Sequence, residues 1–389
     1  MSAQSGRGRP AKGVAVFDLL PPPLDSILAF VVVLGVLVFI HELGHYLAAR
    51  MVGVHVETFS IGFGRAIASW TDSKGTVWKL AWLPLGGYVK LHGQERPEDV
   101  SSDVKALWIE GRTFHEKQVA ARAFVVAAGP LANFLLAAVL FAGLYAVLGK
   151  PVVADRAEPL AVIGEVVANS AAARAGLQAG DRILALDGTA ISQFSELQRT
   201  VSAAPGRTLA IRVKRGDAEV TLSATIEARG AVGILGIRSA AAPLVFEPAG
   251  IVGSLVGGVT KTWDVSAQTL GGLWQMITAQ RGTEELGGPL RIAQLSGQVA
   301  QLGLASLVSF IAVLSVNLAL INLFPIPILD GGHLLFYIAE AIRGRPLPPR
   351  AQEYGTKAGL ALILALFVFA TWNDLGHLGL FRWVAGLVG

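Results

Sequence analysis

The sequence predicts a multi-pass α-helical membrane protein with four transmembrane helices, a membrane-associated β loop and an inserted β-rich domain. Three observations lead to this class. The 389 residues are 53% hydrophobic and only 15% charged, whereas soluble domains have about 25% charged residues. The apolar residues gather in long stretches without charges. Segments of ordinary polarity separate these stretches, so the apolar excess is not one large soluble core.

The first predicted transmembrane helix spans residues 25–52 and follows a tail, 1–24, whose basic residues and triple proline are typical of disorder. The helix has no charge between Ser26 and Ile40, and its apolar character continues past the motif HELGH at 41–45. A cleaved signal peptide is the alternative interpretation. We disfavour it because the stretch lacks an Ala-x-Ala exit and continues into HELGH.

Three further stretches predict membrane segments, at residues 123–149, 301–332 and 358–389, the last ending in an interfacial tail. The second span lies within 27 uncharged residues and the third within 38, above the roughly 20 that cross a bilayer. The segments between the spans are a β loop and connector at 53–122, a β-rich domain at 155–230, an amphipathic or linker region at 231–300 and a loop at 333–357.

Four spans place both chain ends and the β-rich domain on one side of the membrane, and the loops 53–122 and 333–357 on the other. The first and third spans then both run toward the loop side. HELGH and Asp330 therefore reach the same membrane depth. Basic residues near the span ends are slightly more numerous on the loop side, which favours a cytoplasmic loop side.

The spacing in HELGH is that of a zinc hydrolase. On a helix His41 and His45 share one face, and Glu42 is offset by about 100°, so it can address water on a shared ion. The chain has no cysteine, so zinc here must use histidine and carboxylate ligands. Ionisable groups inside a span cost about 2.5 to 3.5 kcal/mol and seldom persist without a partner or a function. The alternative is a polar helix end at the interface.

Catalytic zinc usually has three protein ligands and an open position for water. Asp330 is the candidate third ligand, since it is the first charge after the third apolar run. Pro325 and Pro327 interrupt the helix before it, and two glycines allow a sharp turn after it. Such broken backbone is tolerated at membrane depth only beside a cavity. His333 is the rival ligand, and a helix N-cap or an interfacial charge is the alternative role of Asp330.

The other histidines have no partner at ligand spacing and are expected on the surface: His55, His92, His115 and His377. Nucleic acid is an unlikely partner, because the 32 basic and 28 acidic residues are scattered along the chain.

Two regions have strand character. Residues 54–91 alternate in polarity between glycines, which predicts a β element that holds a substrate segment extended at a sheet edge. A small sheet of purely structural use is the alternative. Residues 161–226 contain AVIGEVV, ILALDG and TLAIRVKR between turn signals, among them Asp187-Gly188.

HELGH in the first span together with NLFPIPILDGG in the third resembles the site-2 protease family of intramembrane zinc metalloproteases. FSIGFGR at 59–65, LPLGGYVKL at 83–91, AAGPLANF at 127–134 and GGPLRIAQ at 287–294 extend the resemblance. Residues 169–188 resemble the core of a bacterial PDZ domain, a fold that binds extended peptides. Similar members of this family carry two tandem PDZ domains, whereas this chain has room for one.

The resemblance implies that His41, His45 and Asp330 hold Zn²⁺, that Glu42 is the general base, and that Asn317 and Asn322 hold substrate backbone. It implies an endopeptidase of the bacterial inner membrane, with its site toward the cytoplasm and its PDZ domain in the periplasm. The implied substrates are single-span membrane proteins such as anti-sigma factors that another protease has shortened, as in regulated intramembrane proteolysis. Remnant signal peptides are a second class, and the PDZ domain would bind a peptide or substrate end.

Two functions of other classes compete with this one. A metal or proton transporter could place His and Asp in facing spans, but has little use for the HELGH glutamate beside a PDZ domain. A silent PDZ-bearing membrane scaffold does not need Glu42 and all three ligands intact. Zinc stoichiometry together with a cleavage assay separates the three.

Overall fold

The computed structural model describes residues 24–95, 100–153, 161–168, 170–229, 232–240, 244–278 and 287–377. The predicted N-terminal tail up to residue 23 and the interfacial tail after residue 377 lie outside these ranges. The chain divides into two compact units, one formed by residues 1–148 with 249–389 and the other by residues 149–248.

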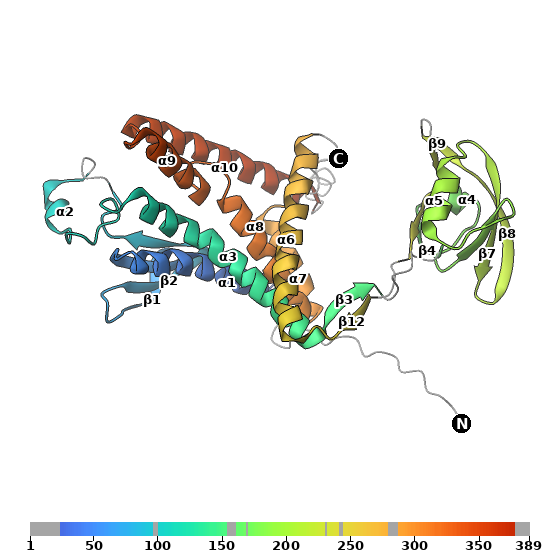
Figure 1. Cartoon of the computed structure of the whole chain (residues 1–389), viewed down its shortest axis with the longest axis horizontal. Coiled ribbons are helices and arrows are strands. Elements are labelled where there is room, and N and C mark those ends of the chain that lie inside the picture. The colour runs from blue at the N-terminus through green and yellow to red at the C-terminus, as the bar shows by residue number, and fades with distance from the viewer. Residues whose placement is uncertain are drawn as a thin grey trace, which may run out of the picture. The chain divides into compact units, whose positions relative to one another are not determined.

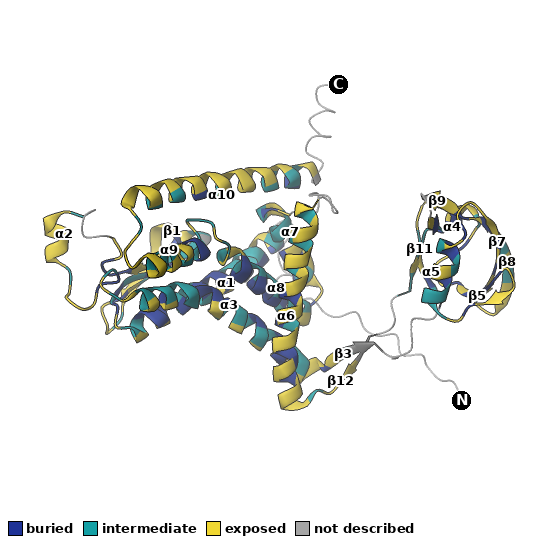
Figure 2. Ribbon diagram, turned by 45° about the horizontal axis from the view of Figure 1, so that its top comes forward, coloured by how far each residue is buried: buried dark blue, intermediate teal, exposed yellow. Residues whose placement is uncertain are grey.

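Among the described residues of the first unit, four helices are long and apolar enough to cross a membrane. This confirms the four predicted spans. They are α1 (Leu24–Met51), α3 (Val119–Leu148), α8 (Leu304–Asn322) and α10 (Pro349–His377). Figure 2 shows α10 as mostly exposed, as expected for a helix whose surface faces lipid rather than protein.

Helix α3 is the centre of the helical unit (Figure 1). It contacts α1, α8, α6 (Gly250–Ile277) and α9 (Asp330–Arg343). Glycines let these helices approach closely: a Cβ on Gly44 would lie 2.3 Å from the carbonyl oxygen of Ala128, and one on Gly258 2.3 Å from that of Ala138. Small residues at helix contacts are how membrane helices associate, since lipid supplies no hydrophobic drive between them.

A buried carboxylate joins the fourth span to the rest of the unit. Asp374 of α10 accepts backbone hydrogen bonds from Gly288, Leu290 and Arg291 at 2.8, 3.1 and 3.1 Å. These amides form the start of α7 (Pro289–Gln301), where unpaired N–H groups favour an anion. The charge therefore has partners although it lies in an apolar helix.

Two connecting segments differ from expectation. The region expected as an amphipathic or linker segment, 231–300, contains the 28-residue helix α6, and the region expected as a loop from residue 333 begins inside α9. In α6 the many Gly, Ser and Thr residues, together with Lys261 and Asp264, lower the apolar signal. In α9 the glycines that suggested a turn lie in the first helical turn. A short helix, α2 (Ser102–Ala106), precedes α3.

The predicted β loop forms one hairpin sheet from β1 (Val56–Thr71) and β2 (Val77–Leu91). Residues 56–61 pair with residues 87–91, and residues 58–61 pair also with residues 77–80, whereas residues 66–71 pair with residues 77–81. The bend within β1 requires glycine at 62 and 64, where φ is +87° and +88°. Among the described residues, 87–91 therefore form one edge of the sheet.

The second unit contains the inserted β-rich domain, and its strands fit the predicted PDZ domain. Its main sheet has the strand order β6-β5-β7-β8, and β11 pairs with β4. The Asp187-Gly188 hairpin was predicted correctly, since both residues have the positive φ that such a two-residue turn requires. The strands are β4 (Ile163–Val166), β5 (Arg182–Leu186), β6 (Thr189–Ala190), β7 (Thr208–Arg215), β8 (Ala218–Thr225) and β11 (Ile237–Ser239).

The domain core is apolar and includes Ile183 and Ile211 of the sheet and Leu197 of α5, each at most 1% exposed. Pairing of β11 with β4 and of β12 with β3 extends the unit beyond the predicted 155–230. The remaining elements are β3 (Lys150–Val153), α4 (Ala171–Arg174), α5 (Phe194–Ser202), β9 (Glu227–Arg229), β10 (Val232–Ile234) and β12 (Leu244–Glu247).

Candidate metal centre

The two histidines of HELGH and Asp330 meet between α1 and the start of α9. His41 Nε2 lies 3.2 Å from Asp330 Oδ2, His45 Nε2 lies 3.5 Å from the same oxygen, and the two Nε2 atoms are 3.3 Å apart. Tetrahedral zinc with N and O ligands separates its ligand atoms by about 3.3 Å. Asp330 Oδ2 is buried and accepts no hydrogen bond, as expected of a metal ligand. These residues fit a zinc ion.

The backbone around Asp330 is folded tightly. A Cβ on Gly331 would lie 2.2 Å from the carbonyl oxygen of Leu323, and one on Gly332 2.3 Å from that of Ile326. The connection from α8 thus packs directly on the first turn of α9. Ile328 adopts φ +124°, a strained conformation for a branched residue, of the kind that occurs beside functional sites. Only glycines fit after Asp330, and they fix where its carboxylate lies.

Helix α3 supports the histidines without supplying a ligand. The Nδ1 atom of His45 lies 2.9 Å from the carbonyl oxygen of Val125, and the Nδ1 atom of His41 lies 3.2 Å from the side chain of Asn133. Gly129 lies between these two contacts, and a Cβ there would approach His45 Nε2 to 2.3 Å. The absence of a side chain at Gly129 therefore makes room for an imidazole.

The edge of the β1–β2 sheet passes beside Glu42. A Cβ on Gly87 would lie 2.7 Å from Val38 Cγ1 and 3.1 Å from Glu42 Cγ, so only glycine lets the strand approach α1 this closely. Gly87, Tyr88 and Val89 line the same cavity as the metal-ligand candidates. An open strand edge thus lies next to the candidate general base.

The cavity at this centre has a volume of about 1010 Å³. Asn322 lines it, whereas Asn317 lies outside its lining and accepts a hydrogen bond from Thr269 of α6 at 2.9 Å. His333 also lines the cavity, but among the described residues the group able to share one ion is His41, His45 and Asp330.

A half-buried ion pair forms part of the cavity wall. Arg122 of α3 contacts Glu340 of α9 at 2.7 Å, and its guanidinium lies 5.0 Å from the centre of the Tyr337 ring. The pair joins the helix that supports the histidines to the helix that carries Asp330.

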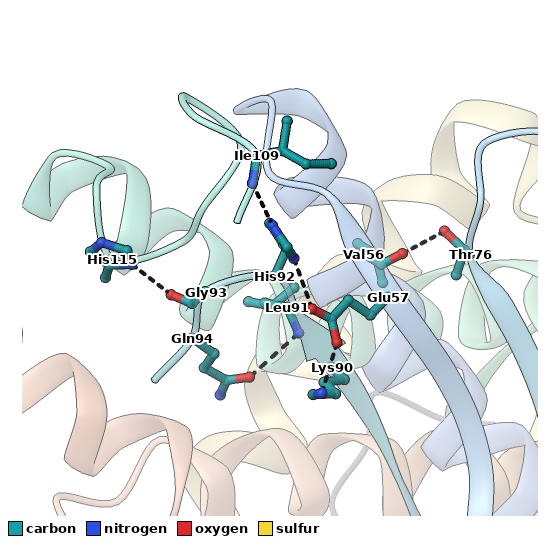
Figure 3. A network of polar contacts seen from close by, with 10 residues as sticks. All are labelled: Val56, Glu57, Thr76, Lys90, Leu91, His92, Gly93, Gln94, Ile109 and His115. Atoms are coloured by element: carbon teal, nitrogen blue, oxygen red, sulfur yellow. Dashed lines mark hydrogen bonds and ion pairs between the residues drawn. The ribbon is translucent and has the colours of Figure 1, made fainter. Parts of the chain in front are cut away.

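A second polar network fixes the chain beyond β2 (Figure 3). His92 Nδ1 donates to Glu57 at 2.8 Å, and His92 Nε2 accepts from the N–H of Ile109 at 2.9 Å. Lys90 contacts the other oxygen of Glu57 at 2.8 Å. Burial raises the pKa of Glu57, but the hydrogen bonds from Lys90 and His92 outweigh it and hold the pKa below its usual value. His92 is buried, so its prediction as a surface histidine was wrong.

The sequence interpretation assigned no role to Gly129, Asn133 or Arg122. A signal was present for Asn133, because a lone amide in the middle of an apolar span needs a partner. Gly129 and Asn133 also lie four residues apart, so they share one face of α3.

Comparison with known proteins gives the family. The model of peptidase family M50 matches residues 29–366. This chain belongs to peptidase family M50. A Rhizobium meliloti protein named as a zinc metalloprotease is 40% identical over 369 residues, which cover 91% of this chain and 97% of that protein. The metalloprotease MmpA of Caulobacter vibrioides is 36% identical over 399 residues, which cover 94% and 98%.

The regulator of sigma-E protease RseP of Escherichia coli is 32% identical over 453 residues, which cover 91% of this chain and 99% of that protein. The M50 chain is thus a membrane zinc metalloprotease of the site-2 protease type. The predicted family, enzyme class and zinc cofactor are confirmed.

Proposed function

We propose that this M50 protease hydrolyses peptide bonds within or near transmembrane helices, at a zinc ion held by His41, His45 and Asp330. The observation that carries the proposal is the triangle of ligand atoms, 3.2 to 3.5 Å apart, formed by one helix from the start of the chain and one near its end. Two imidazoles and one carboxylate leave a fourth position open for water or substrate.

The chemistry needs one proton carrier. Zinc, when bound, polarises the scissile carbonyl and lowers the pKa of water in the site. Glu42 accepts a proton from the attacking water as its oxygen adds to the carbonyl carbon. When the carbon–nitrogen bond breaks, Glu42 delivers that proton to the leaving nitrogen.

Substrate must be extended at this centre, because a helical peptide keeps its carbonyls in its own hydrogen bonds. The edge of the sheet at residues 87–91 lies beside Glu42 and, among the described residues, pairs with no further strand on its outer side, so an extended substrate segment could be added there. Asn322 in the cavity wall would hold the backbone of that segment. Asn317 could do so only by exchanging its hydrogen bond with Thr269.

The proposed substrates are single-span membrane proteins, foremost anti-sigma factors already shortened by another protease, with remnant signal peptides as a second class. The E. coli relative is named a regulator of sigma-E, which supports this substrate class. The proposed location is the bacterial inner membrane, with the metal centre toward the cytoplasm and the PDZ domain in the periplasm. With four spans, the metal centre and the PDZ domain are expected on opposite sides of the membrane. The PDZ domain would bind a substrate end.

The test compares full-length wild-type enzyme with Glu42→Gln on a truncated single-span substrate. The amide fills the same space but cannot accept a proton, so we expect one zinc per chain in both proteins and cleavage only by the wild type. Glu95→Gln, at an exposed glutamate outside the cavity lining, is the matched control and should cleave normally.

Retained turnover in Glu42→Gln would overturn the mechanism. Wild-type protein that binds zinc without cleaving would instead support the scaffold, and zinc uptake into vesicles without cleavage would support the transporter.

A further inference from the structure

The amide of Asn133 is an unexplained polar group beside the metal centre. The residue is fully buried in α3, one of the apolar spans. Its Nδ2 atom lies 3.2 Å from His41 Nδ1, and its Oδ1 atom is buried without a hydrogen-bond partner. A buried amide oxygen left unpaired costs free energy, so its presence calls for an explanation.

The two histidines must each place a proton on Nδ1 if Nε2 is the ligand atom, since only the bare nitrogen binds metal. For His45 the acceptor of that proton is the carbonyl oxygen of Val125, at 2.9 Å. For His41 the group at Nδ1 is the Asn133 side chain. When Asn133 Nδ2 faces the ring, it donates to His41 Nδ1. The ring proton of His41 then lies on Nε2, which is the atom that must be free of a proton to bind the metal.

A half-turn of the amide about its Cβ–Cγ bond exchanges the two atoms. Oδ1 then faces Nδ1 and accepts its proton, which leaves Nε2 bare and directed at Asp330 and His45. The turn breaks no hydrogen bond of Oδ1, because that atom has none. The two amide orientations therefore correspond to the two tautomers of His41, and only one of them can bind a metal through Nε2.

We propose that Asn133 is a positioning residue whose side-chain oxygen accepts the Nδ1 proton of His41 in the zinc-loaded protein, and so fixes the tautomer and ring plane that present Nε2 to the ion. This inference rests on the metal centre proposed above.

The backbone of α3 is anchored to make this contact. Ser315 of α8 donates to the carbonyl oxygen of Asn133 at 2.8 Å. Val125, Gly129 and Asn133 follow each other at four-residue steps, so one face of α3 supplies both outer hydrogen-bond partners and the space for the His45 ring. The helix that binds no metal thereby orients both imidazoles.

The experiment measures zinc affinity of full-length protein by competition with a chelator. Asn133→Leu is similar in size and offers no acceptor, so we expect zinc to bind about 10- to 100-fold more weakly, the usual effect of losing an outer partner. Asn133→Asp keeps an acceptor oxygen in place and should bind within a few-fold of the wild type. If Asn133 had only a structural role, the Asp variant would not keep zinc affinity while the Leu variant loses it.

Ser296→Ala is the matched control. It removes a buried hydrogen bond to the carbonyl oxygen of Ile292 in α7, outside the lining of the cavity, and should leave zinc affinity unchanged. Thermal unfolding of the zinc-free proteins, measured alongside, separates weak binding from loss of fold.

His41→Ala tests the proposed site itself. If it keeps wild-type zinc affinity, the metal centre is misassigned. If it loses zinc while folded Asn133→Leu binds like the wild type, the centre stands and the role of Asn133 is overturned. Equal weakening by Leu and Asp in folded proteins also overturns the acceptor role.

Discussion

The metal centre and the PDZ domain both bury polar side chains, but they surround them differently. In the PDZ domain Asp181 is 1% exposed, and its carboxylate accepts from Arg215 at 2.7 Å through both oxygens and from the N–H of Gln178 at 2.9 Å. In the helical unit Asp330 Oδ2 and Asn133 Oδ1 are buried without hydrogen-bond partners. A satisfied buried carboxylate stabilises a fold, whereas unsatisfied atoms gathered beside two histidines indicate a place for a ligand.

The largest expected effect is at the metal centre. Asp330→Asn replaces an anionic ligand by a neutral amide, and we expect zinc affinity and cleavage to fall by more than about 100-fold, since outer hydrogen-bond partners alone contribute about 10- to 100-fold. The fold should persist, because the close contacts of Oδ2 are to the two histidines of the same centre and an amide fills the same space. Zinc content and a cleavage assay check this. Unchanged values, with both lost in His333→Ala, would identify His333 as the third ligand.

In the PDZ domain the same kind of change should cost stability instead. Arg215→Met leaves the buried Asp181 carboxylate with one backbone partner, so we expect the domain to lose stability, though less than a fully buried pair would lose, because the Arg215 side chain is 33% exposed. Hydrogen exchange of β5 and β7 in the full-length protein measures the loss. Arg212→Met, an exposed arginine on the same strand, is the control. If Arg215→Met lowered zinc affinity, the PDZ domain would affect the metal centre as well as its own stability, and the contrast between the two would not hold.

The pH dependence of the PDZ domain sharpens the comparison. The hydrogen bonds from Arg215 hold the pKa of Asp181 below its usual value, so the stabilisation is present above the unfolded pKa of about 4. It is lost as pH falls through the lower folded pKa. The hydrogen-exchange rate of β5, corrected for the intrinsic effect of pH, should rise below about pH 4 in the wild type and less steeply in Arg215→Met. If the exchange rates of the two proteins change with pH in the same way, Asp181 does not cause the loss of stability at low pH.

The smallest effect should come from removing the domain. Val153 of β3 pairs with Leu244 of β12, so a short turn can replace residues 154–243 and keep this hairpin. Because the domain supplies no ligand, we expect kcat/KM for a trimmed substrate to change less than about threefold, or under about 0.7 kcal/mol. Cleavage of a substrate that keeps its folded outer domain should increase. Equal rejection of the long substrate by both enzymes would contradict selective gating by the PDZ domain.

The residues that could be predicted from the sequence were those that stand out from their neighbours. Histidines and a carboxylate inside apolar runs are conspicuous, so the four spans and the metal-ligand candidates were found without coordinates. Contacts between residues that are distant in the sequence could not be predicted. Asn133 contacts His41 from another helix, and His92 is buried because Glu57 and Ile109 meet it from separate segments.

Local signals also misled where packing decided the outcome. Gly331 and Gly332 suggested a turn and a loop after Asp330, yet they begin α9 because only glycine fits against the carbonyls of Leu323 and Ile326. Helix α6 was hidden by its small polar residues, which are what allow it to pack closely on α3. In both cases glycine marks a close contact with a neighbouring segment rather than a break in the helix.

The division of the proposed centre between α1 and α9 has a consequence for biosynthesis. The ribosome makes the two histidines early and Asp330 close to the end, with the whole PDZ domain in between. At about 5–20 residues per second the delay is on the order of tens of seconds. Throughout that time the nascent chain lacks a complete set of candidate ligands. Proteolytic competence is therefore expected only after Asp330 has been made, and a chain terminated before that residue would lack the proposed centre.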